Sequence, residues 1–182
     1  IRDAFTYMIK NNSNIWGIYP VANPFFMNHA MSHGLYYIVG CMWGCKNIHK
    51  DELKVTIDDK EDFERSIKYY QKDGLNIRFN YVTVKTKYYK EPGGMQETRT
   101  NDRVTKSAYY LASKYPTLCV LNESKKSGKT EVKFLPQESN KKINLNEMEN
   151  SRIPASEDVK NVYLKKTKKR KKSIKNKNTK KN

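Results

Sequence analysis

Apolar positions repeat along the first 135 residues with the two periods that distinguish helices from strands. Apolar residues spaced three and four apart predict helices at 1–10, 58–73 and 101–114. Short alternating or continuous apolar runs predict strands at 15–19, 35–43, 53–57, 77–84, 118–121 and 130–135. Because strands and helices alternate, we expect an α/β domain with a mixed sheet and flanking helices.

The longest apolar run, Leu35–Trp43, lies between two glycines. A continuous run of this length with no polar side is typical of a strand buried on both faces of a sheet. We therefore expect it to be a central strand.

The segment that follows residue 57 has a clear helix signature. Asp58 or Asp59 can cap the amino end, and acids in a first turn complement the helix dipole. Gly74 is a typical residue to end the helix. Its buried face is predicted by apolar residues at i, i+4 and i+7, namely Phe63, Ile67 and Tyr70.

The composition changes at Pro136, beyond which apolar residues become sparse and Asn, Lys and Glu dominate. We therefore expect an α/β domain at 1–135, a polar linker at 136–164 and a disordered lysine-rich tail at 165–182. The sequence does not begin with Met, and its first residues have the pattern expected in the middle of a secondary-structure element. We accordingly expect the domain to be the C-terminal part of a larger catalytic domain.

Positive charge is concentrated in the tail. The chain carries a formal net charge of +17, and residues 165–182 hold eleven Lys or Arg and no acid. Such a cluster binds polyanions through their phosphates, and it also matches nuclear import signals. The expected nucleic-acid-binding residues are Lys165, Lys166, Lys168, Lys169, Arg170, Lys171 and Lys172.

Several classes of protein are disfavoured. No run of about 18 apolar residues is present, so we expect no membrane-spanning helix and no membrane partner. Three cysteines provide no disulfide framework, which favours an intracellular protein, cytoplasmic or nuclear. A zinc site from His29, His33, Cys41 and Cys45 is disfavoured because the ligand pairs are not spaced around a turn and a helix.

Glu61 and Asp62 are the candidate catalytic residues. They open a predicted helix that follows a predicted strand, which would place their carboxylates at the carboxyl edge of the sheet, where α/β proteins bind ligands. A carboxylate there can accept a proton as a general base. The alternative is that these acids only complement the helix dipole.

Two loops are candidate substrate-binding segments. In the loop at 85–96 two glycines allow close approach to a ligand, cations can neutralise a diphosphate and tyrosines can stack on a ring. The alternative is a solvated turn. Asn23 lies in the second, Pro-stiffened loop at 17–27, whose aromatic residues form either a substrate wall or core packing. The expected residues of the first loop region are Lys85, Lys87, Tyr88, Gly93, Gly94 and Arg99.

A resemblance links these segments across residues 16–135. It is carried by Ser32–Gly40, Glu61–Ser66, Asp73-Gly74, Arg78-Phe79-Asn80 and Gly93-Gly94. Their order resembles the C-terminal half of the A-type nucleotide-sugar glycosyltransferases. More narrowly, it resembles the TET-associated and base-J-associated enzymes of viruses, phages and some eukaryotes.

The resemblance implies a nucleotide-sugar donor, a divalent Mn or Mg ion, and Asp62 or Glu61 as the catalytic or acceptor-binding acid. The family's metal-binding Asp-x-Asp motif is not found upstream of Glu61 in this chain.

Two functions follow as hypotheses. The first is transfer of a sugar to a hydroxyl acceptor, including hydroxylated bases in DNA. The second is a non-catalytic nucleic-acid-binding protein that uses its basic body and tail. A third reading is an α/β protein whose tail only localises it.

Overall fold

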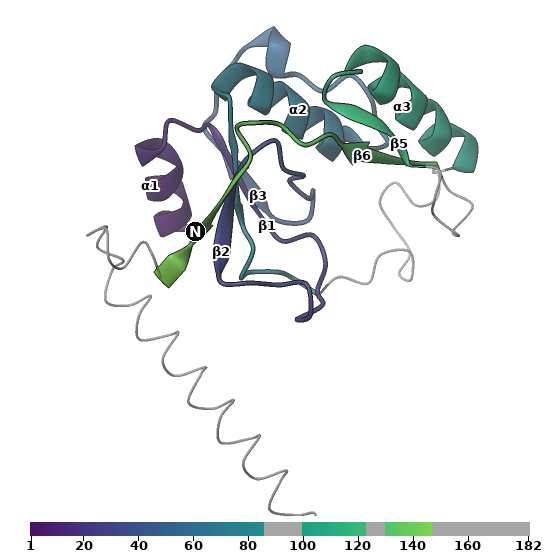
Figure 1. The fold of residues 1–182 in the computed structure, drawn as a ribbon. Coiled ribbons are helices and arrows are strands. Elements are labelled where there is room, and N and C mark those ends of the chain that lie inside the picture. The colour runs from purple at the N-terminus through teal and green to yellow at the C-terminus, as the bar shows by residue number, and fades with distance from the viewer. Residues whose placement is uncertain (86–99, 123–129, 147–182) are drawn as a thin grey trace, which may run out of the picture. The chain divides into compact units, whose positions relative to one another are not determined.

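The computed structural model spans residues 1–182, and the structure describes residues 1–85, 100–122 and 130–146. The chain divides into two compact units, Ile1–Asn144 and Leu145–Asn182. The described part of the first unit is an α/β arrangement with a mixed five-stranded sheet and flanking helices (Figure 1). The α/β class expected from the sequence is therefore confirmed.

The main sheet has the strand order β3-β1-β4-β2-β7. Only β1 and β4 run parallel among the described strands, and the remaining neighbours are antiparallel. The strands are β1 (Ile15–Ile18), β2 (Ala30–Gly34), β3 (Trp43–Cys45), β4 (Asn76–Phe79) and β7 (Lys141–Asn144).

The strand register gives the sheet one aromatic face and one polar face. Helix α1 (Arg2–Lys10) lies on the aromatic face, where the ring of Tyr7 is 6.1 Å from that of Phe79 and the ring of Phe5 is 5.6 Å from that of Trp16. On the opposite face the register aligns Gly17, Arg78 and Ser32 across three strands. Alternation along β4 therefore places its polar residues on the face away from α1.

Helix α2 (Glu61–Asp73) forms as predicted, with Ile67 fully buried and Phe63 and Tyr70 packed against the core. Gly74 ends it with φ +75°, a conformation that glycine adopts without strain. The predicted aspartate cap is wrong. The N-cap is Lys60, without a side-chain cap, while buried Asp59 lies 3.3 Å from Nε of Arg103.

Helix α3 (Asn101–Lys114) matches its predicted bounds, and the hydroxyl of Thr100 caps it by accepting from the backbone of Arg103. It is followed by the hairpin of β5 (Cys119–Asn122) and β6 (Glu131–Phe134). These elements share one core with α2, and Figure 1 shows them beside that helix. The core residues are Leu35, Ile67, Ala108, Leu111, Tyr115, Leu118, Cys119 and Val132.

Three strand predictions need correction. Residues 35–42 form no strand, and the strand next to them is β2, which ends at Gly34. Residues 53–57 form no strand either, because the 3-10 turn η1 (Asp51–Leu53) leads into irregular chain. The strand expected at 77–84 is only Asn76–Phe79.

The C-terminal boundary of the sheet also differs from the expectation. The polar linker was expected from residue 136, whereas Lys141–Asn144 pairs with β2 as an outer strand. A strand with this composition has no apolar periodicity because its side chains, apart from Ile143, are exposed at the edge of the sheet. The tail at 165–182 lies outside the described residues.

Candidate functional site

The segment at 35–40 crosses the polar face of the sheet, and side chains hold its backbone in place. Three backbone N–H groups donate to side-chain oxygens: Leu35 to Asn140 Oδ1 (2.7 Å), Ile38 to Ser66 Oγ (3.0 Å) and Gly40 to Asp62 Oδ2 (3.4 Å). Two backbone carbonyls accept from side chains: Tyr36 from Asn76 Nδ2 (3.2 Å) and Tyr37 from Arg78 (3.5 Å). These bonds replace the ladder of a neighbouring strand, which satisfies the backbone without sheet pairing. The segment at 35–40 is thus bound by side chains, and its residues Leu35, Ile38 and Val39 are buried.

Gly17 allows this segment to approach the sheet closely. A Cβ atom at Gly17 would lie 2.5 Å from Cγ2 of Ile38, which is too short for a real contact. Ile38 is completely buried there, together with Ile15 and Tyr69. The absence of a side chain at Gly17 therefore sets how deeply the segment lies on the sheet.

Asp62 and Tyr37 form a pair between the segment and the first turn of α2. The Tyr37 hydroxyl donates a hydrogen bond to Oδ2 of Asp62, and Oδ1 accepts from the backbone of Phe63 at 3.0 Å. The Tyr37 ring stacks on Phe63 with centroids 4.3 Å apart. Asp62 is half-buried, and these hydrogen bonds orient its carboxylate.

Glu61 is engaged differently from its neighbour. Its Oε1 lies 3.7 Å from the guanidinium of Arg65, one turn along the same helix. Arg65 in turn covers the ring of Trp43 at 4.1 Å from the centroid. Asp62 accepts a hydrogen bond from a tyrosine hydroxyl of the 35–40 segment, so of the two acids predicted as catalytic Asp62 is the stronger candidate.

The premise that placed these acids at the carboxyl edge of the sheet is wrong, because α2 follows irregular chain and not a strand. Helix α2 contacts the amino ends of the parallel strands. The Asp73 carboxylate accepts from Asn14, just before β1, and the carbonyl of Ser66 accepts from Asn76, the first residue of β4. In Figure 1 the segments that leave the carboxyl ends of β1 and β4 lie at the opposite end of the sheet.

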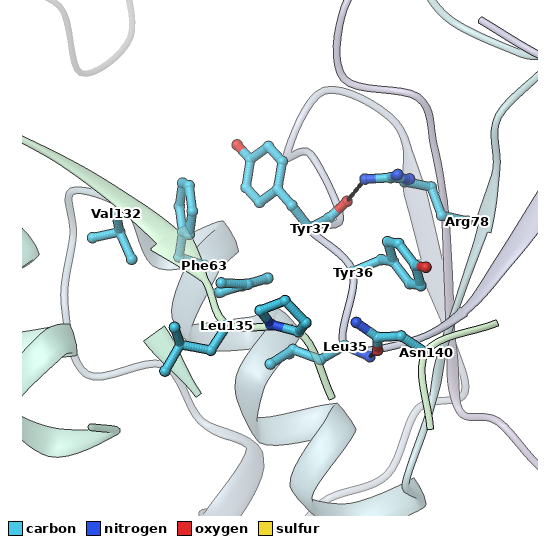
Figure 2. A pocket seen from close by; sticks show the side chains of 10 residues that line it. Leu35, Tyr36, Tyr37, Phe63, Arg78, Val132, Leu135 and Asn140 are labelled. Atoms are coloured by element: carbon cyan, nitrogen blue, oxygen red, sulfur yellow. Dashed lines mark hydrogen bonds between the residues drawn. The ribbon is translucent and has the colours of Figure 1, made fainter. Parts of the chain in front are cut away.

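A pocket of about 530 Å³ opens beside this pair. Tyr37 and Phe63 form one wall, so the neighbour and the hydrogen-bond partner of Asp62 both line it (Figure 2). Most of the lining is aromatic or aliphatic, and two polar side chains interrupt it. The lining residues are Leu35, Tyr36, Tyr37, Phe63, Arg78, Val132, Phe134, Leu135, Pro136 and Asn140.

Arg78 is the cation of this pocket. Its guanidinium lies between two tyrosines, 4.9 Å from the ring centre of Tyr36 and 5.2 Å from that of Tyr19. Its Nε donates to Asn80 Oδ1 at 3.0 Å, and Figure 2 shows its bond to the carbonyl of Tyr37. Burial lowers the pKa of the Arg78 guanidinium, and the tyrosines partly offset this. Among the described residues no carboxylate lies within ion-pair distance of it.

The predicted substrate-binding residues lie away from this pocket or outside the described residues. Asn23 is exposed in the loop after β1, where its side chain accepts from the backbone of Phe25. Phe25 is 85% exposed, so the core-packing interpretation of this loop is wrong. Lys85 is exposed after β4. The predicted residues outside the described ranges are Lys87, Tyr88, Gly93, Gly94, Arg99 and the tail cations from Lys165 to Lys172.

Sequence reasoning missed Tyr37 and Arg78. Tyr37 belonged to the run interpreted as a strand, where a tyrosine is ordinary. The signal for Arg78 was present, since a cation stands between two buried apolar residues of a short strand, Ile77 and Phe79. A charged side chain in that position is partly buried and needs partners.

No group of three or more His, Cys, Asp or Glu side chains comes together as a metal site within 1–85, 100–122 and 130–146. His33 of the disfavoured zinc set lies on the α1 face, 3.2 Å from the Tyr7 hydroxyl. Such a cluster for the divalent ion that the resemblance implies is therefore absent from the described residues. In the same part of the chain, no helix has the length and apolar character needed to cross a membrane.

Comparison with known proteins adds no assignment. No family model, curated protein or solved structure matches this chain. The Tyr37–Asp62 pair and the pocket beside it are the features of the chain that bear on its function.

Proposed function

We propose that the chain is part of a glycosyltransferase that moves a sugar from a nucleotide-sugar donor to a hydroxyl acceptor. The single observation that carries the proposal is the half-buried Asp62, whose carboxylate accepts a hydrogen bond from Tyr37, a residue that lines an aromatic pocket. Oriented carboxylates beside clefts are suited to general-base chemistry, and aromatic walls suit sugar or base rings. The resemblance described above assigns the same acid to catalysis.

In this mechanism Asp62 takes the proton of the acceptor hydroxyl. The acceptor oxygen forms a bond to the anomeric carbon as the bond between that carbon and the diphosphate oxygen breaks. The nucleoside diphosphate leaves with the electron pair of the broken bond. Tyr37 orients the carboxylate by its hydrogen bond to Oδ2. Oδ1 accepts one bond, from the backbone of Phe63, and so keeps a lone pair for the acceptor proton.

A structural role for Asp62 competes with this assignment, because its Oδ2 also accepts from the backbone of Gly40. The catalytic and the structural role predict different effects of a neutral side chain of the same shape at position 62. An asparagine can keep accepting hydrogen bonds from Tyr37 and Gly40, whereas it cannot accept a proton from the acceptor. Substitution of Asp62 by Asn therefore separates catalysis from positioning.

The direct test supplies the protein with nucleotide-sugars and a divalent ion, and offers duplex DNA containing 5-hydroxymethyl pyrimidines as the acceptor. Mass spectrometry of the digested DNA then detects a nucleoside that is heavier by one sugar residue. Unmodified DNA is the matched acceptor control. The absence of any sugar adduct across the common donor sugars would reject this acceptor, and slow donor hydrolysis by the protein would still support transfer to another hydroxyl.

A second candidate function is nucleic-acid binding without catalysis, and the basic tail favours it. Residues 165–182 hold eleven cations and no acid, the arrangement expected to attract phosphates. This function needs neither Asp62 nor the pocket. The salt dependence of DNA binding tests it, as described in the Discussion.

A further inference from the structure

The pocket beside Tyr37 is lined by both aromatic rings and a cation. Tyr36, Tyr37 and Phe63 contribute rings, and Arg78, whose guanidinium is bonded to the carbonyl of Tyr37, also lines it (Figure 2). A partly buried cation normally has an acidic partner, because desolvating an unpaired charge is unfavourable. Within the described residues, Arg78 has tyrosine rings and carbonyl-type oxygens as its partners instead.

The partners of Arg78 hold it without neutralising it. The ring faces of Tyr19 and Tyr36 attract the cation weakly, and the oxygens of Asn80 and Tyr37 are neutral acceptors. The planar guanidinium is therefore oriented in advance, which reduces the entropy lost when it binds a further group. The group that best completes such a site is a carboxylate or phosphate, bound through the fork of N–H donors.

The rest of the pocket restricts what carries that anion. The stacked pair of Tyr37 and Phe63 and the ring of Phe134, 5.4 Å from that of Phe63, offer flat apolar surfaces. Asn140 contributes the second polar side chain, and its Oδ1 is already used by the backbone of Leu35. A ring can stack on these walls while its acidic group reaches Arg78.

We infer that the pocket at 35–37, 63, 78 and 132–140 binds a flat ring that carries one anionic group, a phosphate or a carboxylate. Tyr36, Tyr37 and Phe63 stack on the ring, and Arg78 binds the anion. The inference rests on the pocket and does not depend on glycosyl transfer.

Calorimetric titration of the full chain at about 150 mM salt tests the inference, because that ionic strength screens much of the attraction to the tail. One arm uses the nucleoside 5′-monophosphates AMP, GMP, CMP and UMP, and the other uses indole-3-acetate and benzoate. Adenosine, uridine and indole are the ring-only controls, and inorganic phosphate and acetate are the anion-only controls. The arm that binds shows whether the anion is a phosphate or a carboxylate.

At least one ring-bearing anion is expected to bind with Kd below about 1 mM, and its separate ring and anion at least about tenfold more weakly. Arg78→Met should weaken binding about tenfold or more, the scale of a lost charged hydrogen bond. Arg65→Met is the matched control, since Arg65 also covers an aromatic ring but lies outside the pocket lining. Tyr36→Leu should weaken binding as well, and it keeps the test informative if Arg78→Met does not fold.

The inference is overturned if no ring-bearing anion binds, if ring-free anions bind equally well, or if Arg65→Met weakens binding as much as Arg78→Met. Asp102→Asn should leave ligand affinity within about twofold, because Asp102 is an exposed residue of α3 outside the pocket lining. A bound ring-bearing anion without any sugar transfer would leave this inference standing and count against the proposed function. If sugar transfer proceeds unchanged in Arg78→Met and no ring-bearing anion binds, the proposed function stands and this inference is overturned.

Discussion

The hydroxyl of Tyr37 donates a hydrogen bond to Oδ2 of Asp62 and so joins the irregular segment at 35–40 to the first turn of α2. The same carboxylate oxygen accepts from the backbone of Gly40 at 3.4 Å. The Asp62 carboxylate therefore binds both the side chain of Tyr37, which lines the aromatic pocket, and the backbone at the end of the segment.

Asp62→Asn should lower the rate of sugar transfer by about a hundredfold or more, the usual effect of losing general-base help, while melting changes little. The matched control is Asp102→Asn. Asp102 is also an acid in a first helical turn, but it is exposed and its carboxylate lies 2.7 Å from the amine of Lys106. Steady-state kinetics and thermal melting of both variants decide the matter. Equal activity in Asp62→Asn and Asp102→Asn would reduce Asp62 to a structural residue.

Glu64 should make stability depend on pH. Burial alone would raise the pKa of this fully buried carboxyl, but hydrogen bonds from the backbone and hydroxyl of Thr56, with Lys68 and Lys114 nearby, bring it below its ordinary value of 4.5. A group with a lowered folded pKa stabilises the protein above its unfolded pKa, and this stability is lost as the pH falls through the folded pKa.

The change that tests this dependence is Glu64→Gln. It should destabilise the protein by about 2 to 4 kcal/mol at pH 7, because two lysines lose their buried partner. Between about pH 5 and pH 3 the difference from the unmodified protein should shrink. Urea unfolding at several pH values measures it, with exposed Glu138→Gln as the control. A difference that stays constant with pH would show that Glu64 does not titrate differently on unfolding.

Gly17→Ala should destabilise the protein by about 1 to 3 kcal/mol, because the added Cβ would lie 2.5 Å from Cγ2 of Ile38. Gly40→Ala is the control within the same site. A Cβ there meets its nearest atom at 3.4 Å, so its effect should stay within about 0.5 kcal/mol. Denaturant unfolding compares the two variants. Equal stability would mean that the segment at 35–40 moves freely away from the sheet.

Truncation tests the role of β7. A chain that ends after Leu135 loses the strand that pairs with β2, and it also loses the Asn140 side chain that binds the backbone of Leu35. We expect it to melt at a clearly lower temperature than a chain that ends after Asn146, or without a cooperative transition. Circular dichroism melting compares the two chains. Identical melting would show that β7 adds nothing to the stability of the sheet.

The basic tail should control non-specific binding to DNA. Deletion of 165–182 should leave the melting of the domain unchanged, since Ile174 is the only aliphatic residue there. DNA affinity of the full chain should fall steeply between low and physiological salt, because binding releases counterions. Fluorescence anisotropy at several salt concentrations measures both chains. A flat salt dependence in the full chain would mean that the tail is not the contact surface.

The helices were predictable because the determinants of each lie within its own residues. The helix at 101–114 has its capping threonine immediately before it and apolar residues at helical spacing within it, and α3 has these bounds. The α2 helix likewise contains its own stripe and ends at a glycine in the left-handed conformation. The sequence also placed a candidate acid, Asp62, in the first turn of that helix, where the structure has it.

What the sequence determined by itself was thus the local structure, namely the α2 and α3 helices, the hairpin formed by β5 and β6, and the position of the charge excess in the tail. Only the tertiary structure decided that Leu35–Val39 is not a strand and that Lys141–Asn144 is one. The backbone of the first segment is bonded by side chains from α2, β4 and Asn140, while the second pairs with β2 more than a hundred residues earlier. Hydrogen-bond partners so distant along the chain leave no periodicity in the sequence nearby, and for the same reason the pocket of Tyr37, Phe63 and Arg78 came into view only once the chain was folded.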